Sequence, residues 1–316
     1  MTMNIEKILD RTSLGRIQSA GHMQLIPILG DDDASFAPPV LQVGTCRYGS
    51  VMLKNDADRP TIVPPGAGWV VQQKAQDHAI GGGALLRAGQ DRLIETALCI
   101  QQAQGGCISP AKHAMLILPA ALRAKALAMR HVSDFRKHWS DITEFNRALG
   151  ISNPGGHLEF FLKTFQRELD QFVAEFEIVP SQIGAIVLLG GKLVGIERAP
   201  SAAYWQVVWE PLVRVSYGSL AIQVAKSGAT SVRDALSVQE RSLVGIRKAL
   251  RVAETREAES VDALLSVVRP IALECANDGE ERIGSIAMST VTSPRLAGQI
   301  VTVGDAVRFA SICVAA

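Results

Sequence analysis

Short apolar runs separated by polar turns fill roughly the first 115 residues. The runs lie at 25–29, 40–54, 61–73, 92–102 and 115–118, and turn-forming residues such as those at 30–33, 55–56 and 64–66 stand between them. Alternating or short continuous apolar runs bounded by Gly, Pro, Asn and Asp are typical of strands. The pattern therefore predicts an N-terminal antiparallel sheet or sandwich.

From about residue 120 the apolar positions recur every three or four residues. One such series runs from Val132 to Leu149 and a second, rich in Phe, from Leu158 to Phe176. This spacing places the apolar side chains on one face of a helix, so both segments are predicted to be helices that bury that face.

A β-hairpin and a third helix are predicted next. Two apolar runs at 183–189 and 192–196 flank Gly190-Gly191, which suits a tight two-residue turn. The helix after them carries Trp205 and Trp209, and Pro211 predicts a local irregularity in it.

Beyond Lys226 the composition changes to a charged helix, expected over about 232–268, with Leu243, Ile246, Leu250 and Ala253 at helical spacing. A final pair of strands is expected at 282–292 and 297–314. The whole pattern indicates an α+β protein: a main domain over residues 1–226 with a β-sheet or sandwich, a helical segment and a hairpin. Residues 227–316 form a C-terminal extension, either packed on the same core or used for self-assembly.

Composition narrows the function classes. The 316 residues are 47% hydrophobic and 20% charged with a net charge of +1, so no basic field favours nucleic acid. No apolar run reaches the length of a membrane span, and the first residues do not resemble an export signal, so a soluble cytoplasmic protein is expected. The five cysteines are scattered, which argues against a zinc site.

Gln76-Asp77-His78, followed by Gly81-Gly82-Gly83, is the first candidate site. Asp77 and His78 are candidates for an acid/base pair, and a glycine run lets a ligand approach the backbone closely. The structural alternative is a polar turn whose glycines only permit positive φ, since neighbouring side chains on a strand point to opposite faces.

A second candidate lies between Cys99 and Cys107. Gln101, Gln102 and Gln104 supply hydrogen-bond donors and acceptors without charge, which suits recognition of an amide or a purine edge. Cys99 has no base beside it in the sequence to form a thiolate, so it is not expected to be a nucleophile.

The third candidate, Asp31-Asp32-Asp33, is interpreted as a solvated turn. Three consecutive carboxylates do not converge on one cation. The sequence contains no phosphate-binding loop, dinucleotide fingerprint or metalloprotease motif, so neither a metal nor a cofactor is expected.

A block around the hairpin resembles a known family. It reads Gln-Ile-Gly-Ala-Ile-Val at 182–187, Gly-Lys-Leu-Val-Gly-Ile-Glu at 191–197 and Trp-Glu-Pro-Leu-Val-Arg at 209–214. Together with the strand at 24–28, this is similar to the domain named for its association with ADP-ribosylglycohydrolases and rhodanese-phosphatases, a domain of unknown function. The resemblance covers residues 20–226 and implies a role near ADP-ribose or NAD-derived metabolites.

The chain departs from the family pattern at both candidate segments. Where the family has a segment similar to Cys-Val-Glu-Gln-Gly-Arg-Trp, this chain reads Cys-Ile-Gln-Gln-Ala-Gln-Gly at 99–105. On that match an acid becomes Gln101, an arginine becomes Gln104 and a tryptophan becomes Gly105. An amide neither takes nor gives a proton as an acid/base catalyst, so position 101 cannot serve as one here.

Three hypotheses follow. The leading one is a binding or accessory protein that recognises a nucleotide-derived small molecule through Gln76, Asp77, His78, Gln101, Gln102, Gln104 and Glu197. The second is an enzyme acting on an ADP-ribose or NAD derivative, with Asp77 or His78 as the base. The third is a protein-interaction module that self-assembles through residues 227–316.

Overall fold

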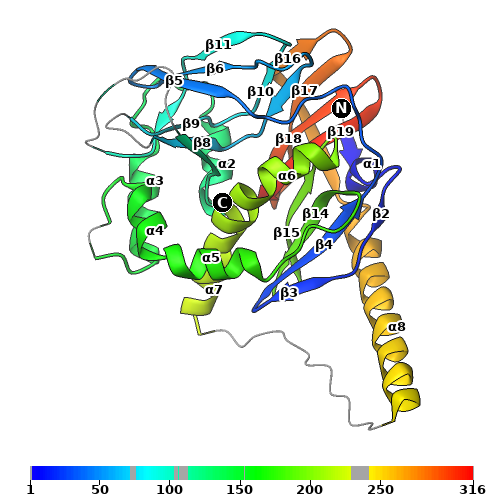
Figure 1. Cartoon of the computed structure of the whole chain (residues 1–316). Helices are drawn as coiled ribbons and strands as arrows, with labels where there is room; N and C mark the ends of the chain where they lie inside the picture. Colours follow the sequence, from blue (N-terminus) through cyan, green and yellow to red (C-terminus); the bar gives the residue numbers. More distant parts are fainter. Residues whose placement is uncertain are drawn as a thin grey trace.

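The structure is a computed structural model that describes residues 2–71, 76–102, 106, 113–152, 154–228 and 242–315. It confirms the α+β class: one large open sheet, three smaller sheets and helices packed against them (Figure 1). Among the described residues, no helix is both long and apolar enough to cross a membrane.

The large sheet is antiparallel and holds ten strands. Its order is β1-β16-β17-β18-β19-β15-β14-β4-β2, and β3 also pairs with β4. The strands are β1 (Thr2–Asn4), β2 (Ser13–Leu14), β3 (Gln18–Ala20), β4 (Met23–Leu29), β14 (Gln182–Leu189), β15 (Lys192–Arg198), β16 (Ala272–Ile283), β17 (Ile286–Thr292), β18 (Leu296–Val303) and β19 (Ala306–Val314).

The predicted N-terminal strands form three small antiparallel sheets, with orders β10-β7, β11-β6-β5 and β12-β9-β8-β13. Every apolar run of the first 118 residues contains at least one of these strands or β4. The strands are β5 (Gln42–Arg47), β6 (Ser50–Lys54), β7 (Thr61–Val63), β8 (Ala67–Val71), β9 (His78–Ala79), β10 (Ala84–Leu86), β11 (Asp91–Ile94), β12 (Leu98–Cys99) and β13 (His113–Ile117).

The helices cover both faces of the large sheet. They are α1 (Ile5–Ile8), α2 (Ala120–Ala128), α3 (Trp139–Ala148), α4 (Leu158–Thr164), α5 (Gln166–Ala174), α6 (Ala202–Glu210), the π-helix η1 (Pro211–Tyr217), α7 (Gly218–Lys226) and α8 (Leu243–Val268).

Alternation along β14 shows how the sheet separates two cores. Ala185 and Val187 belong to the core shared with α6, η1 and the small sheets. Ile186 and Leu188 belong to the core shared with α1 and the end of α8. A strand buried on both faces is a continuous apolar run, which is the pattern of residues 183–189.

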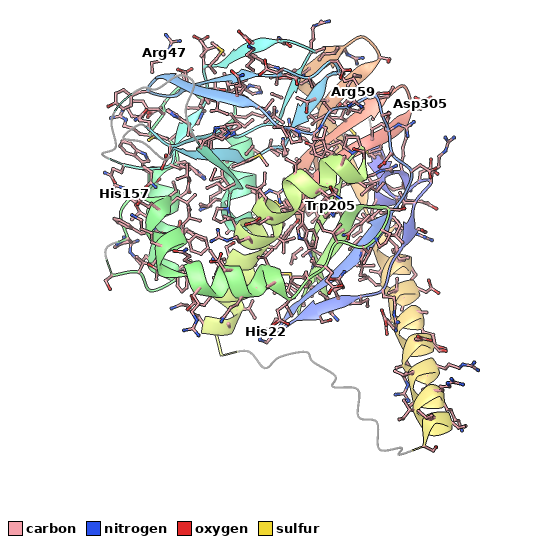
Figure 2. The ribbon with its side chains drawn as sticks, viewed as in Figure 1. His22, Arg47, Arg59, His157, Trp205 and Asp305 are labelled. Atoms are coloured by element: carbon pink, nitrogen blue, oxygen red, sulfur yellow. The ribbon has the colours of Figure 1, made fainter. Side chains whose placement is uncertain are left out.

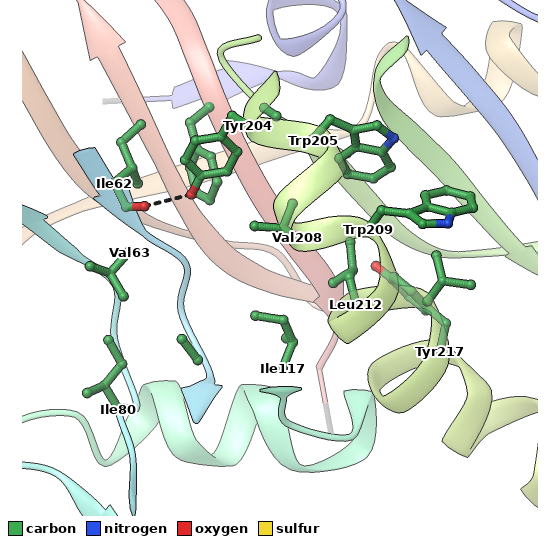
Figure 3. Packing of buried hydrophobic residues seen from close by; sticks show 14 of the residues in the cluster. Ile62, Val63, Ile80, Ile117, Tyr204, Trp205, Val208, Trp209, Leu212 and Tyr217 are labelled. Atoms are coloured by element: carbon green, nitrogen blue, oxygen red, sulfur yellow. Dashed lines mark hydrogen bonds between the residues drawn. The ribbon is translucent and has the colours of Figure 1, made fainter. Parts of the chain in front are cut away.

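Aromatic side chains of α6 fill the first core (Figure 3). Trp205 and Trp209 meet edge to face with ring centroids 5.6 Å apart. The hydroxyl of Tyr204 donates to the Ile62 carbonyl at 2.7 Å, which ties α6 to β7 across the layers.

Several boundaries differ from the prediction. The helix expected from Val132 begins only at Trp139, and the Phe-rich helix is two helices that meet at Phe165. The irregularity expected at Pro211 is confirmed as the start of η1, because proline has no N–H to donate to the preceding turn.

The C-terminal strands were under-counted. Four strands, β16 to β19, replace the expected pair and form an antiparallel meander, whose turns include Gly284 and Gly304, both with positive φ. β19 pairs with β15 from Gly195↔Cys313 to Arg198↔Ala310, so residues on either side of Lys226 share one sheet.

Candidate functional site

The small sheet β12-β9-β8-β13 brings the two predicted site segments together. Cys99 pairs with His78 and Leu98 with Ala79, in antiparallel register. The register continues past the strand ends, because the Ile100 amide donates to the Asp77 carbonyl at 3.1 Å. Residues 76–78 and 99–101 therefore lie side by side.

These side chains are buried. Gln76 and Asp77 are each 2% exposed, and His78 and Gln101 each 1%. Gln102 is exposed. Its Oε1 accepts a hydrogen bond from the Gly156 amide at 3.0 Å, so the Gln102 side chain holds the loop at Gly156. Gln104 lies outside the described residues.

Two of the buried groups have hydrogen-bonding capacity that the described part of the chain leaves unused. Neither Nε2 nor Oε1 of Gln101 has a hydrogen-bond partner there, and the His78 imidazole has at most one, the Gln76 backbone. A buried polar group without a partner costs about 1–3 kcal/mol of stability. Such groups side by side are typical of a site that completes its bonds with a ligand.

The His78 and Cys99 side chains of this cluster are uncharged at physiological pH. Burial lowers the pKa of His78 to about 4, so its imidazole is neutral at physiological pH and offers one donor and one acceptor. Burial also raises the pKa of the Cys99 thiol. That thiol lies 3.0 Å from the Gln101 carbonyl and accepts from Gln76 Nε2 at 3.6 Å, which makes it a hydrogen-bonding link and not a nucleophile.

Helices α3 and α4 support the strand that carries Gln101. The Trp139 indole donates to the Cys99 carbonyl at 3.1 Å, and the Leu158 amide donates to the Ile100 carbonyl at 3.0 Å. Gln101 itself forms an isolated antiparallel bridge with His157, which precedes α4 (Figure 2). The site is therefore built on packed elements.

The glycine run has a packing role. None of Gly81, Gly82 and Gly83 has a positive φ. A Cβ at Gly81 would lie 2.2 Å from the Ala126 carbonyl oxygen, so the run is glycine because it passes so close to α2. The run also lines a cavity of about 290 Å³.

The two arginines that line this cavity already have hydrogen-bond partners within the protein. Arg92 donates from both terminal nitrogens to Glu281, at 2.6 and 2.7 Å. Arg130 donates to the Leu127 carbonyl at the end of α2. The geometry therefore gives no preference for an anionic ligand beside the glycines.

Glu197 lies in a different buried cluster. Its Oε1 accepts from Arg123 Nη1 at 2.8 Å and from the Tyr217 hydroxyl at 2.6 Å. Burial raises the pKa of Tyr217 and keeps that hydroxyl a donor. Arg123 also donates to Ser311 Oγ at 2.6 Å, so the carboxylate belongs to a network joining α2, β15, η1 and β19.

Two of the three aspartates after β4 are bonded within the protein. Asp32 Oδ1 accepts the Ala202 amide at 2.6 Å at the start of α6, and Asp33 Oδ2 lies 3.2 Å from Arg308 Nε. No group of three or more potential metal ligands is present in the part of the chain that the structure describes.

The sequence model of the ARG and Rhodanese-Phosphatase-superfamily-associated Protein domain, ARPP-1, matches residues 11–272. The chain belongs to this family. The match extends past Lys226 through α8 to Ala272, the first residue of β16 in the large sheet. No curated protein and no solved structure gave a match.

Within this ARPP-1 domain, sequence reasoning missed the supporting residues of the site. Trp139 and Asn146 both lie in the series predicted as an apolar helix face, yet the Trp139 indole donates a hydrogen bond to the Cys99 carbonyl of the site strand. Asn146 Nδ2 donates to the carbonyls of Pro154 at 2.7 Å and His157 at 2.9 Å. Asn146 was a polar residue in an otherwise apolar series, which was the available signal.

Proposed function

We propose that this ARPP-1 domain is a cytoplasmic binding or accessory protein that recognises a nucleotide-derived small molecule related to ADP-ribose or NAD. The ligand meets the polar cluster of Gln76, Asp77, His78 and Gln101. One observation carries the proposal: His78 and Gln101 are buried on adjacent segments with hydrogen-bonding atoms that no described residue satisfies.

The chemistry of His78 and Gln101 favours an uncharged part of such a ligand. A neutral imidazole and a carboxamide each present a donor and an acceptor, which complements a purine edge or a nicotinamide carboxamide. The association recorded in the family name supports an ADP-ribose-related molecule. Gln102 is proposed to lie at the rim. Glu197 is left out of the proposed site because its carboxylate is bonded to Arg123 and Tyr217.

Binding is favoured over catalysis by the state of His78. A general base works best with a pKa near the operating pH, and a pKa of about 4 makes the imidazole a weak base. Cys99, as a buried thiol, offers no nucleophile. We therefore propose recognition without turnover.

A thermal-shift screen tests the proposal. ADP-ribose, NAD, AMP, cyclic nucleotides and divalent cations are each added to the full chain at millimolar concentration. A ligand at about 100 times its Kd adds about 2.7 kcal/mol, which raises the Tm by a few degrees. We expect this rise with one nucleotide class and no turnover of that ligand. No shift with any of them would contradict the proposal.

A further inference from the structure

Helix α8 is anchored at only one end. Of its 26 residues, Leu265 and Val268 near the C-terminus are buried in the core beneath the large sheet. At the other end, Leu243 is 78% and Leu250 43% exposed. Figure 1 shows this end projecting away from the sheets. We call residues 243–253 the overhang; at 1.5 Å per residue it is about 16 Å long.

The overhang and the anchored end of α8 carry apolar residues on the same side of the helix, with Glu254 and Glu257 between them. At about 100° per residue, Leu243, Ile246 and Leu250 lie on the same side of α8 as Val261 and Val268. The anchored half of this side packs on the protein. The overhanging half is also apolar, and none of its residues belongs to a hydrophobic core cluster of the described chain.

The overhang and the rest of α8 also differ in charge. The overhang carries three basic residues and no acidic one: Arg247, Lys248 and Arg251. Residues 254–268 carry four acidic residues and one basic one: Glu254, Glu257, Glu259, Asp262 and Arg256. A helix favours acidic residues near its N-terminus and basic ones near its C-terminus, so this order is unfavourable for the isolated helix.

A groove of about 560 Å³ runs beside the anchored half of α8. Its apolar lining includes Leu9, Leu14, Val261 and Leu265. Its charged lining is Glu254, Glu257, Asp262, Arg16 and Arg269, a net charge of −1. Both glutamates already lie near Arg16, at 3.5 and 3.7 Å. The groove therefore has apolar residues to pack against the overhang, and its net charge is opposite in sign to that of the overhang.

We propose that two copies of this chain pair through antiparallel α8 helices, the overhang of each lying in the groove of the other. Such an interface is two-fold symmetric, so each contact occurs twice. On the helical wheel Arg247 and Arg251 share one flank with Glu254 and Asp262, and like flanks face each other in antiparallel helices. Basic positions of one copy then meet acidic positions of the other.

The charge division favours a second copy over an anionic surface. A membrane or nucleic acid that attracted the basic overhang would repel the acidic residues that follow on the same flank. Only a partner with the reverse order of charges satisfies both halves, and an antiparallel copy of α8 has that order.

Sedimentation equilibrium of the full chain with a charge swap tests the pairing. One variant, Arg247→Glu with Arg251→Glu, makes the overhang acidic; the other, Glu254→Lys with Asp262→Lys, makes the groove basic. All four side chains are exposed. Arg256→Glu, on the opposite side of the helix, is the matched control.

We expect the wild type and Arg256→Glu to sediment at twice the mass of the chain and each swap variant at the monomer mass. An equimolar mixture of the two swap variants returns to the doubled mass, because both of its overhangs then meet grooves of opposite charge. A monomeric wild type, dimeric single swaps or a mixture that stays monomeric would each overturn the pairing.

Discussion

Gln101 and Gln182 are both 1% exposed, but they differ in whether the described chain supplies hydrogen-bond partners for their side chains. Gln182 accepts the Val179 amide at 3.0 Å and donates to the Gly184 carbonyl at 2.9 Å. The Gln101 amide has no such partners in the described chain. The fold accounts for the hydrogen bonds of Gln182, and we propose that a ligand completes those of Gln101.

Substitution by leucine separates these roles. We expect Gln182→Leu to lower the free energy of unfolding by about 1–3 kcal/mol, because it leaves buried backbone groups unpaired. Gln101→Leu is expected to leave stability unchanged or to raise it, since it removes atoms that were already unsatisfied. Urea denaturation at pH 7 measures both. Equal losses in the two variants would assign Gln101 a structural role.

His78 predicts a specific dependence of stability on pH. The unfolded state binds a proton with the ordinary pKa of 6.5, whereas the native state binds it only near 4. The contribution is complete above pH 6.5 and is lost as the pH falls towards 4. Between pH 7 and 5 the wild type should lose about 2 kcal/mol more than His78→Gln. Urea denaturation curves of equal pH dependence would contradict the burial of this imidazole.

At the scale of elements, the network around Glu197 joins α2, β15, η1 and β19. Gly195 makes room for it, because a Cβ there would lie 1.9 Å from the Tyr217 hydroxyl oxygen. Each member comes from a different part of the chain, so the network fixes how these elements pack.

Removing both members of the buried pair should cost less stability than the sum of the two single removals. Arg123→Leu and Glu197→Leu are each expected to lower the free energy of unfolding by about 3–5 kcal/mol, since each leaves an uncompensated buried charge. The double variant is expected to lose clearly less than the sum. A double-mutant cycle by urea denaturation measures the coupling. Additive losses would show that the two side chains are independent.

Elements with a strong local signal were predicted well from the sequence. The hairpin at Gly190-Gly191 and the break at Pro211 follow from turn and proline chemistry, and both occur as expected. The split at Phe165 was not predictable, because the apolar spacing runs on unbroken through it. Gln101 and His78 are both candidate site residues in the sequence, but their proximity depends on strand pairing across 21 residues, from His78 to Cys99, which spacing does not reveal.

At the scale of the molecule, the strands after α8 complete the large sheet. β15 pairs with β14 on one side and β19 on the other, so both of its edges are covered. Phe309 and Ile312 of β19 lie in the two cores on either side of the sheet.

A chain that ends at Lys226 is therefore expected not to fold. It exposes one edge of β15 and opens both cores, losing the apolar contacts of β16–β19. We expect no cooperative thermal transition by circular dichroism, compared with a single transition in the full chain. A cooperative transition in the shortened chain would show that residues 1–226 are an independent domain.

The central claim is that the buried polar cluster around His78 and Gln101 holds a nucleotide-derived ligand. Calorimetric titration of ADP-ribose and of NAD into the wild type, Gln101→Leu and Gln182→Leu tests it most directly. We predict saturable one-to-one binding of one of them to the wild type and to Gln182→Leu, and binding at least about 10-fold weaker to Gln101→Leu, the loss of one or two hydrogen bonds. Absence of binding to the wild type, or equal binding to Gln101→Leu, would contradict the account.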